Sequence, residues 1–282
     1  MLEALLRASG LPWLEARMLA ERALGLSAVQ VATQLREPVS EPSQTALEKL
    51  CARRRGGEPI AYILGEREFY GRRFTVTPQV LIPRPETELL CEAVLERLSR
   101  ASALRGASLL DLGTGSGAIA ITLACERPGL RVTAIDASAG ALDVARGNAQ
   151  RLCGADSIRF FQSDWFAAAG DERFDVIASN PPYVAAGDAH LTSGDLRFEP
   201  IDALQAGVDG MDCIRAIALK APQHLNPAGW LLLEHGFSQG MAVRDTLASC
   251  GLVDVFTRKD LAGLERVSGA CLPGGLGHLT KV

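Results

Sequence analysis

Strand-like and helix-like stretches alternate along the chain from Gly106 onward, and this alternation constrains the fold more than any other feature. Short apolar runs predict strands near residues 108–112, 131–136, 158–164, 174–180 and 229–235, and helical patterns fall near 117–126, 138–152, 211–225 and 239–249. Such alternation is typical of an α/β domain with a doubly wound parallel sheet and helices on both faces. Two further strands, near 252–257 and 266–272, follow one another without a long helix, so we expect an antiparallel pair at the sheet edge.

The first 75 residues or so predict a separate, small helical domain. Leucines recur there at three- and four-residue spacing, and the second helix is opened by Pro12 and closed by Gly25. From about residue 68 to residue 82 the pattern changes to short alternation around a glycine, which predicts a β-hairpin that links two domains. The second domain therefore spans residues 83–282.

A glycine-rich turn joins the first strand of this second domain to its helix. Its residues are Asp111, Leu112, Gly113, Thr114, Gly115, Ser116 and Gly117. Glycines let the backbone turn sharply and bring ligand atoms close to the helix N-terminus. Asp136 ends the second strand, where a carboxylate can accept hydrogen bonds from both ribose hydroxyls, and Asp164 with Trp165 ends the third. Because strand ends on one side of such a sheet form the ligand crevice, we expect these residues to bind a cofactor that contains a nucleoside.

Two cofactor classes use a turn of this kind. In a dinucleotide site the helix N-terminus holds a pyrophosphate, and Gly113, Gly115 and Ala118 would satisfy its glycine pattern. However, Asp111 would repel a pyrophosphate and suit an ammonium group, and the glycine spacing is tighter than a dinucleotide needs. S-adenosylmethionine fits better. Its amino-acid end suits Asp111 and the glycine turn, its ribose suits Asp136, and its adenine suits Asp164 and Trp165.

The fourth strand ends in Asn180, Pro181, Pro182 and Tyr183. The prolines stiffen the loop, and because they carry no N–H they leave carbonyl acceptors with few competing donors. The Asn180 side-chain oxygen adds an acceptor, and Tyr183 adds a flat face. These four residues suit a planar NH2 group, so we predict that they hold a substrate amino or amide nitrogen. Taken alone, the tetrapeptide is equally compatible with an ordinary turn at a strand end.

Composition restricts the partners and the compartment. The net charge of −4 and the pI near 5.7 argue against a protein whose affinity depends on neutralising many phosphates. The seven cysteines are scattered singly and the four histidines are dispersed, which favours a reducing compartment and predicts no metal site. No leader pattern and no apolar run long enough to cross a bilayer is evident. We therefore expect a cytoplasmic protein.

With both motifs present in this order, the chain resembles the HemK/PrmC family. The resemblance covers nearly the whole chain, and the motifs that carry it lie at residues 59–65, 69–71, 82–88, 111–117, 162–165, 179–183, 197–200, 233–236 and 265–267. The Pro-Arg-Pro-Glu-Thr-Glu segment at 83–88 and the helical N-terminal domain are its most specific parts. The family methylates the side-chain amide of the glutamine in the Gly-Gly-Gln loop of peptide-chain release factors.

The resemblance implies a seven-stranded, Rossmann-like methyltransferase domain behind a small helical domain that recognises the substrate. It implies cofactor contacts from the glycine turn, Asp136, Trp165 and Asn180, and substrate contacts from residues 180–183. We add Arg84 and Glu88 as further predicted pocket residues. It also implies that the partners are release factors rather than nucleic acid or membrane, and we expect a monomer.

Transfer to an amide nitrogen restricts the catalytic roles. An amide nitrogen is a poor nucleophile because its lone pair is delocalised into the carbonyl group. We predict that the Asn180 side-chain oxygen and the Pro181 backbone oxygen accept its two hydrogens and direct the lone pair at the methyl group. Tyr183 would pack on the amide plane. Direct displacement needs neither a strong base nor a covalent enzyme intermediate.

Three other functions compete at this stage. An adenine-amino methyltransferase acting on DNA or RNA could hold a flipped base with the same tetrapeptide, although a basic face would then be expected. A non-catalytic scaffold that only binds the cofactor would give the Asn180 motif no substrate to hold. A dehydrogenase would bind a nicotinamide cofactor at the glycine turn.

Overall fold

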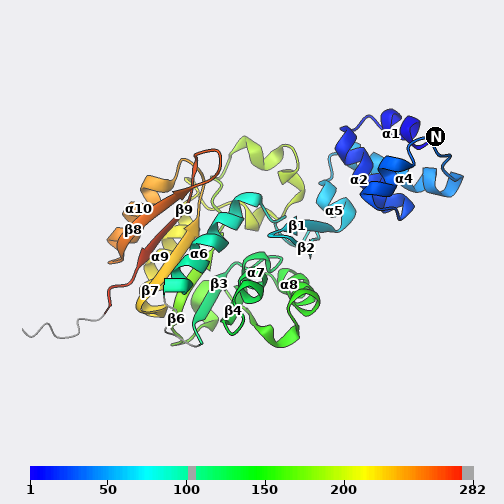
Figure 1. Ribbon diagram of the computed structural model, residues 1–282. Helices are drawn as coiled ribbons and strands as arrows, with labels where there is room; N and C mark the ends of the chain where they lie inside the picture. The colour runs from blue at the N-terminus through cyan, green and yellow to red at the C-terminus, as the bar shows by residue number, and fades with distance from the viewer. Residues whose placement is uncertain (101–105, 275–282) are drawn as a thin grey trace, which may run out of the picture. The chain divides into compact units, whose positions relative to one another are not determined.

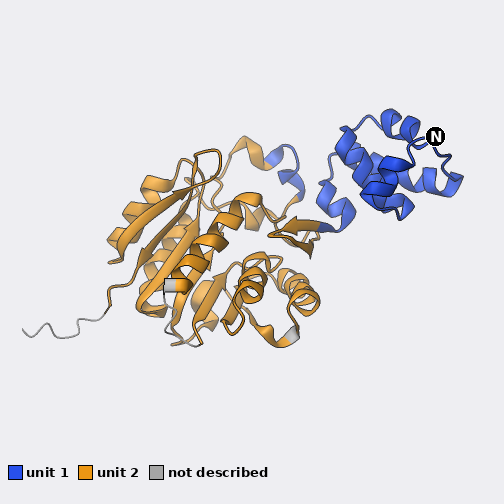
Figure 2. Cartoon of the chain, viewed as in Figure 1, with its two compact units in different colours: residues 1–66, 192–198 blue, residues 67–191, 199–282 orange. Residues whose placement is uncertain are grey.

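The computed structural model describes residues 1–100 and 106–274, which form two compact units (Figure 2). Unit 1 comprises Met1–Glu66 and Thr192–Phe198, and unit 2 comprises the remaining described residues. The predicted domain boundary near residue 75 therefore lies at residue 66 in the structure. The chain also returns to unit 1 once, through the segment Thr192–Phe198.

Unit 1 is helical, as predicted. Its helices are α1 (Leu2–Ala8), α2 (Trp13–Leu24), α3 (Ala28–Thr33), α4 (Glu41–Arg55) and α5 (Ile60–Leu64). Helix α2 begins after Pro12 and ends at Gly25, whose φ of 67° lies in the left-handed region that glycine adopts without strain. Buried side chains such as Leu6, Leu19 and Leu47 form one apolar cluster between these helices. Arg54 donates to Glu15 and to Asp195, so the returning segment is held within unit 1 by ion pairs.

The sheet of unit 2 confirms the predicted doubly wound fold (Figure 1). Its strands are β3 (Ser108–Leu112), β4 (Arg131–Asp136), β5 (Ile158–Gln162), β6 (Phe174–Ser179), β7 (Leu225–Glu234), β8 (Val253–Lys259) and β9 (Glu265–Cys271). They lie in the order β5-β4-β3-β6-β7-β9-β8. The first five are parallel, whereas β9 pairs antiparallel with both β7 and β8, as expected for the edge.

Helices cover both faces of this sheet. On one face the core includes apolar residues of α6 (Glu88–Arg100), α7 (Ala118–Glu126) and α8 (Ala139–Leu152). On the other face it includes apolar residues of α9 (Asp212–His224) and α10 (Gly240–Ser249). Neighbouring residues of β3 serve opposite faces, since Leu109 belongs to the first core and Leu110 to the second. Burial of two apolar faces explains why the central strands are almost continuously hydrophobic.

The hairpin differs from the prediction. It consists of β1 (Glu66–Phe69) and β2 (Arg72–Thr75), with a tight turn at Tyr70 and Gly71, rather than extending over residues 68–82. Phe69 is buried in the core of unit 2, and Asn148 of α8 bonds the backbone N–H and carbonyl of Thr75 at 2.8 and 3.0 Å. The hairpin is therefore part of unit 2 from Arg67 onward, and not a free linker.

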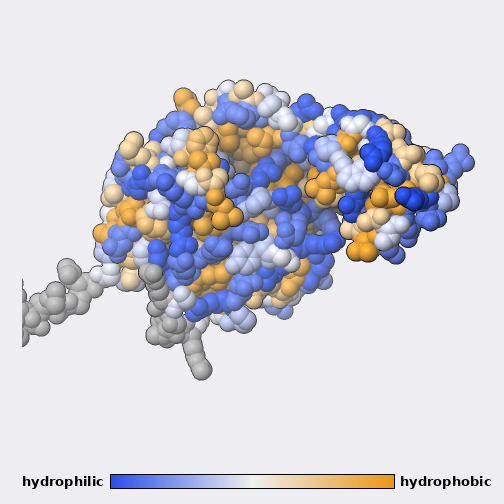
Figure 3. Space-filling model, turned by 45° about the horizontal axis from the view of Figure 1, so that its top comes forward, coloured by the Kyte–Doolittle hydropathy of each residue, from blue (hydrophilic) through white to orange (hydrophobic). Residues whose placement is uncertain are grey.

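No helix within residues 1–100 and 106–274 is long and apolar enough to span a bilayer. The face drawn in Figure 3 has hydrophilic residues interspersed with smaller hydrophobic areas.

Candidate active site

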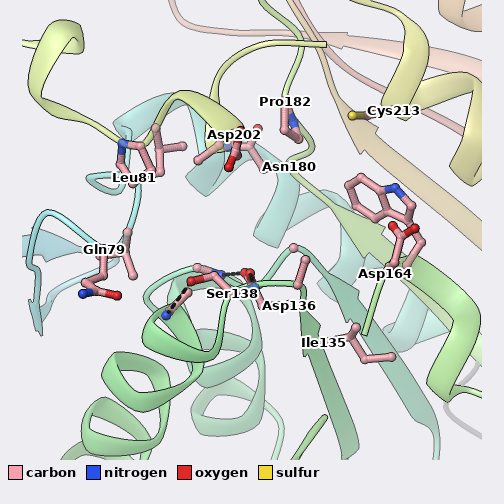
Figure 4. A pocket seen from close by; sticks show the side chains of 18 of the residues that line it. Gln79, Leu81, Ile135, Asp136, Ser138, Asp164, Asn180, Pro182, Asp202 and Cys213 are labelled. Carbon is pink, nitrogen blue, oxygen red and sulfur yellow. Dashed lines mark hydrogen bonds between the residues drawn. The ribbon is translucent and has the colours of Figure 1, made fainter. Parts of the chain in front are cut away.

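The polar residues that follow β3, β4, β5 and β6 meet at one edge of the sheet. Strand β6 lies beside β3 with Ser179 opposite Leu112, so the residues after these two positions are neighbours. Strand order reverses between these two strands, and ligands of doubly wound sheets bind at such a point. A cavity of about 510 Å³ opens there (Figure 4). Its described lining comprises Gln79, Val80, Leu81, Gly113, Gly115, Ile135, Asp136, Ala137, Ser138, Ala141, Ser163, Asp164, Trp165, Asn180, Pro182, Pro200, Asp202, Ala203 and Cys213.

The glycine turn forms part of the cavity wall. Gly113 and Gly115 line the cavity with φ values of 72° and 55°, and Gly117 caps α7 with a φ of 83°. A Cβ at Gly117 would lie 2.6 Å from the Cδ1 of Ile121, so Ile121 would have to shift, and the positive φ disfavours any other residue there. The turn thus brings bare backbone to the cavity while α7 stays packed. Thr114 and Ser116, also predicted at the cofactor, are buried and are not among the described residues that line the cavity.

Asp111 is fully buried beneath this turn. Its Oδ2 accepts hydrogen bonds from the Thr114 hydroxyl at 2.7 Å and from the Ala120 N–H at 3.2 Å. Its Oδ1 has no hydrogen-bond partner among the described residues. Burial raises the pKa of Asp111 to about 7, because the charged form loses its hydration. Asp111 does not line the cavity itself, so its contact with an ammonium group stays a prediction. An orphan buried carboxylate oxygen fits such a group.

Asp136 and Trp165 lie at the cavity as predicted. Asp136 accepts hydrogen bonds from the N–H groups of Gly115 and Ser138 at 2.8 and 2.9 Å, and its carboxylate faces the cavity (Figure 4). Burial nevertheless raises the pKa of Asp136. Trp165 has a φ of 46°, which is uncommon outside glycine, and together with Asp164 it lines the cavity. These carboxylates and the indole fit the ribose and adenine of S-adenosylmethionine, and their individual contacts stay predictions.

Only part of the segment 180–183 lines the cavity. Asn180 and Pro182 line the cavity, whereas Pro181 is buried and Tyr183 is not among the described residues that line it. The Asn180 Nδ2 donates to the Thr87 Oγ1 at 3.1 Å, which leaves its Oδ1 as an acceptor. The Tyr183 hydroxyl donates to the Glu234 Oε1 at 3.3 Å. The roles of Pro181 and Tyr183 at the substrate stay predictions.

Arg84 and Glu88 have structural partners in the free protein. Arg84 forms an ion pair with the buried Glu199, which also accepts a hydrogen bond from the Ile82 N–H at 3.0 Å. Glu88 accepts a hydrogen bond from the Tyr70 N–H at 2.8 Å. Neither Arg84 nor Glu88 is among the described residues that line the cavity, so their predicted cofactor contacts stay untested.

Several lining residues carry no signal in the sequence. Gln79, Val80 and Leu81 follow the hairpin, Asp202 lies three residues after the buried Glu199, and Cys213 lies in the first turn of α9. They come from segments far from the two motifs in the chain, and only the fold brings them to the cavity. The described residues contain no cluster of three side chains that could hold a metal ion.

Comparison with known proteins identifies both parts of the chain. Residues 86–196 match the methyltransferase small domain family, and residues 1–65 match the PrmC N-terminal domain family. The release factor glutamine methyltransferase of Burkholderia pseudomallei is 50% identical over 275 residues, which span 96% of this chain and 95% of that protein. That of Bordetella pertussis is 50% identical over 273 residues, which span 96% and 99%. A 16S rRNA methyltransferase of T. thermophilus, solved with AdoMet and guanosine, has a TM-score of 0.54 and 22% identity over 73% of this chain and 49% of that one. The last likeness shows a shared fold.

Proposed function

The chain belongs to the family of release factor glutamine methyltransferases, and from this membership we propose its reaction and substrate. The enzyme transfers the methyl group of S-adenosylmethionine to the side-chain amide nitrogen of the glutamine in the Gly-Gly-Gln motif of peptide-chain release factors. The observation that carries the proposal is the Asn180 carboxamide, whose Nδ2 is bound to Thr87 and whose Oδ1 is left for a ligand beside the glycine turn.

The cofactor half of the site contains a suitable group for each part of S-adenosylmethionine. Asp136 would accept from the ribose hydroxyls, Trp165 would cover the adenine, and Asp111 would offset the positive charge of the amino-acid end. When bound, the cofactor supplies an activated methyl group on a sulfonium centre. The residues that bind the substrate, 180–183, have to position the amide nitrogen and stabilise the charge that develops on it.

The substrate half has to make an amide nitrogen reactive. The Asn180 Oδ1 and the Pro181 carbonyl oxygen accept the two N–H hydrogens of the substrate amide. Two fixed acceptors orient the nitrogen lone pair and stabilise the positive charge that develops on nitrogen. Tyr183 packs beside the amide as a neutral phenol, because burial raises the pKa of its hydroxyl above its ordinary value. An N-protonated amide loses its proton readily, so no side chain needs to act as a strong base.

We also propose the setting of the reaction. Unit 1 recognises the release factor, and the enzyme works as a cytoplasmic monomer in translation termination without binding nucleic acid directly. The seven free cysteines favour a reducing compartment. The net charge of −4 disfavours binding that depends on phosphate contacts.

An adenine-amino methyltransferase acting on DNA or RNA remains the alternative, because the same acceptors would fit an exocyclic amine. The two functions are separated by incubating the enzyme with labelled S-adenosylmethionine, purified release factor and nucleic acid together. We expect label only in the release factor, and mass spectrometry should place one methyl group on the glutamine of its Gly-Gly-Gln motif.

The matched control is a release factor whose Gly-Gly-Gln glutamine is replaced by asparagine, which shortens the side chain by one methylene while keeping the amide. We expect it to stay unlabelled. Label in nucleic acid, or equal labelling of the control release factor, would contradict the proposed substrate.

A further inference from the structure

Residues 200–203 form part of the cavity wall beside residues 180–183. The Val184 N–H donates to the Leu204 carbonyl oxygen at 2.8 Å, and the Val184 carbonyl oxygen accepts from the Ala206 N–H at 2.9 Å. These bonds form a parallel bridge, and both segments that lead into it contribute residues to the lining of the cavity. A ligand held by residues 180–183 therefore lies next to residues 200–203.

The other end of this wall segment is fixed by Glu199. The Glu199 carboxylate accepts a hydrogen bond from the Ile82 N–H at 3.0 Å and forms an ion pair with Arg84. Its side chain is fully buried, so water does not compete for these contacts. Hydrogen bonds on both sides thus hold the backbone of residues 200–203 in place. A group on a backbone that is already ordered loses less entropy when it binds a ligand.

Asp202 is the charged residue of this wall segment. It is exposed and lines the cavity, and Figure 4 shows it next to Asn180 and across the cavity from Ser138. Among residues 1–100 and 106–274, its carboxylate has neither a hydrogen-bond donor nor a cation as a partner. The Asp136 carboxylate, by contrast, accepts two backbone hydrogen bonds. The Asp202 carboxylate is therefore available to a ligand that enters beside Asn180.

The charges that line the cavity all have the same sign. The described lining contains three carboxylates, those of Asp136, Asp164 and Asp202, and no lysine, arginine or histidine. The first two belong to the cofactor half of the proposed site, where they are assigned to the ribose and the adenine. Asp202 lies at the substrate end, where an anion attracts N–H donors and repels phosphate groups.

Resting on the proposed function, we propose that Asp202 determines which class of substrate reaches the Asn180 acceptor. Its carboxylate accepts hydrogen bonds from backbone N–H groups of the loop that carries the target glutamine, whose two glycines leave those groups unshielded. The exocyclic amine of a nucleic acid would enter with phosphate groups, and the same carboxylate repels them. Asp202 binds the substrate loop and not the nitrogen that accepts the methyl group.

A purely structural role is the competing explanation. Asp202 lies in the first turn of the 3-10 helix Ile201–Ala203, where a carboxylate is favoured by the N–H groups at the helix start. Asp202→Asn keeps the shape and removes the charge, whereas Asp202→Ala also removes the acceptor. Asp245→Asn is the matched control, because it changes the net charge equally at an exposed position on α10 that is not among the described residues lining the cavity.

We expect the KM for release factor to rise at least about 5-fold in Asp202→Ala and at least about 3-fold in Asp202→Asn, because an ionised acceptor binds N–H groups more tightly than a neutral one. The kcat should stay within about 2-fold of the wild type, since the contact with the loop is the same in the ground state and in the transition state. Affinity for S-adenosylmethionine, measured by calorimetry, should stay within about 3-fold. Asp245→Asn should match the wild type in all three quantities.

A second measurement needs no release factor. The affinity for a single-stranded adenine oligonucleotide, measured by fluorescence anisotropy at about 20 mM salt, reports the repulsion of phosphate groups. We expect this affinity to increase at least about 3-fold in Asp202→Asn and less than about 1.5-fold in Asp245→Asn, and the difference should vanish at about 0.5 M salt. If the wild type does not methylate release factor, the proposed function fails, while this measurement still tests the charge at Asp202.

Three results would overturn the specificity role. One is an unchanged KM for release factor in Asp202→Ala, whether or not urea denaturation shows a loss of stability. Another is an equal oligonucleotide affinity of Asp202→Asn and Asp245→Asn. The third is a loss of S-adenosylmethionine affinity larger than the rise in KM, which would place Asp202 at the cofactor. If Asp202→Ala does not fold, the Asp202→Asn variant alone decides.

Discussion

Replacing Asp111 with asparagine should stabilise the free enzyme at alkaline pH and weaken its affinity for the cofactor. Asp111 is fully buried, and burial raises its pKa from 3.8 to about 7. A carboxyl group whose pKa is higher in the folded state binds its proton more tightly there. Its folding penalty is therefore absent below pH 4, grows as the pH rises toward 7, and is complete above that.

The size of this penalty follows from the shift. A shift of about 3 pKa units corresponds to roughly 4 kcal/mol of unfolding free energy, since each unit is about 1.4 kcal/mol. Asparagine cannot ionise, and its Oδ1 can still accept from Thr114 and Ala120. Its NH2 group, however, would replace the unpartnered Oδ1 of Asp111 and find no acceptor among the described residues. Burial of this unpaired donor costs about 1–3 kcal/mol, which offsets part of the gain in unfolding free energy. We expect a net gain of about 1–3 kcal/mol at pH 8.

The measurement is urea denaturation of the wild type and the Asp111→Asn variant at about pH 5 and pH 8. Between these values the wild type should lose about 2–3 kcal/mol that the variant retains. Part of the pH dependence of the unfolding free energy will persist in the Asp111→Asn variant, because burial also raises the pKa of Glu234 to about 7. Asp143→Asn, at an exposed position on α8, is the matched control and should leave the slope unchanged.

Calorimetry completes the test. If Asp111 offsets the positive charge of the cofactor, the variant that is more stable when free should bind S-adenosylmethionine at least about 10-fold more weakly. A variant that is less stable than the wild type at pH 8, with the same pH dependence, would refute the burial argument. Unchanged cofactor affinity would refute the assignment of Asp111 to the ammonium group.

Three further predictions concern other parts of unit 2. Asn180→Ala should raise the barrier to methyl transfer by about 2–4 kcal/mol in kcat while cofactor affinity, measured by calorimetry, falls less; unchanged turnover would remove Asn180 from catalysis. Arg84→Ala should lower the unfolding free energy by about 3 kcal/mol in urea denaturation, because it leaves the buried Glu199 without its cationic partner, and the double variant with Glu199→Gln should recover part of the loss. Gly210→Ala should destabilise by about 2–4 kcal/mol in the same assay, since Gly210 has a φ of 74° and an added Cβ would lie 2.2 Å from the Tyr183 carbonyl oxygen; wild-type stability would contradict this steric reasoning.

The sheet could be predicted, as could the position of Asp136 and Trp165 at its carboxyl edge, because both depend on local patterns. Apolar runs broken by glycine or aspartate determine where strands end, and parallel strands have their carboxyl ends at one edge. Asp136 and Trp165 follow from that rule, since each is placed by the end of its own strand. Gln79, Asp202 and Cys213 do not, because each lies on a segment whose approach to the cavity depends on packing far along the chain.

The domain boundary also depends on contacts between residues far apart in the chain, which local sequence patterns do not reveal. A short alternating segment identifies the hairpin, but its attachment depends on Asn148, which lies 73 positions beyond Thr75 and bonds its backbone. Likewise, no local pattern assigns Thr192–Phe198 to unit 1, because the contact of Asp195 with Arg54 joins positions 141 residues apart. Side-chain hydrogen bonds of this range leave no periodicity in the sequence.

Asp111 and Glu234 are both buried with an unpartnered oxygen and a pKa raised to about 7, yet they should respond differently to ligands. The partner proposed for Asp111 is a cation that arrives with the cofactor, so cofactor binding should lower its pKa and recover its folding penalty. The hydrogen-bond partner of Glu234, the Tyr183 hydroxyl, is present already in the free protein. S-adenosylmethionine raises the unfolding free energy at every pH because it binds the folded state. In addition, it should reduce the pH dependence of the unfolding free energy by the part that comes from Asp111, and leave the part that comes from Glu234. The slope that remains should decrease in Glu234→Gln and persist in Asp111→Asn, and part of it should survive in both variants because burial also raises the pKa of Asp136. If the cofactor removes the Glu234 contribution as well, Glu234 belongs to the cofactor half of the site.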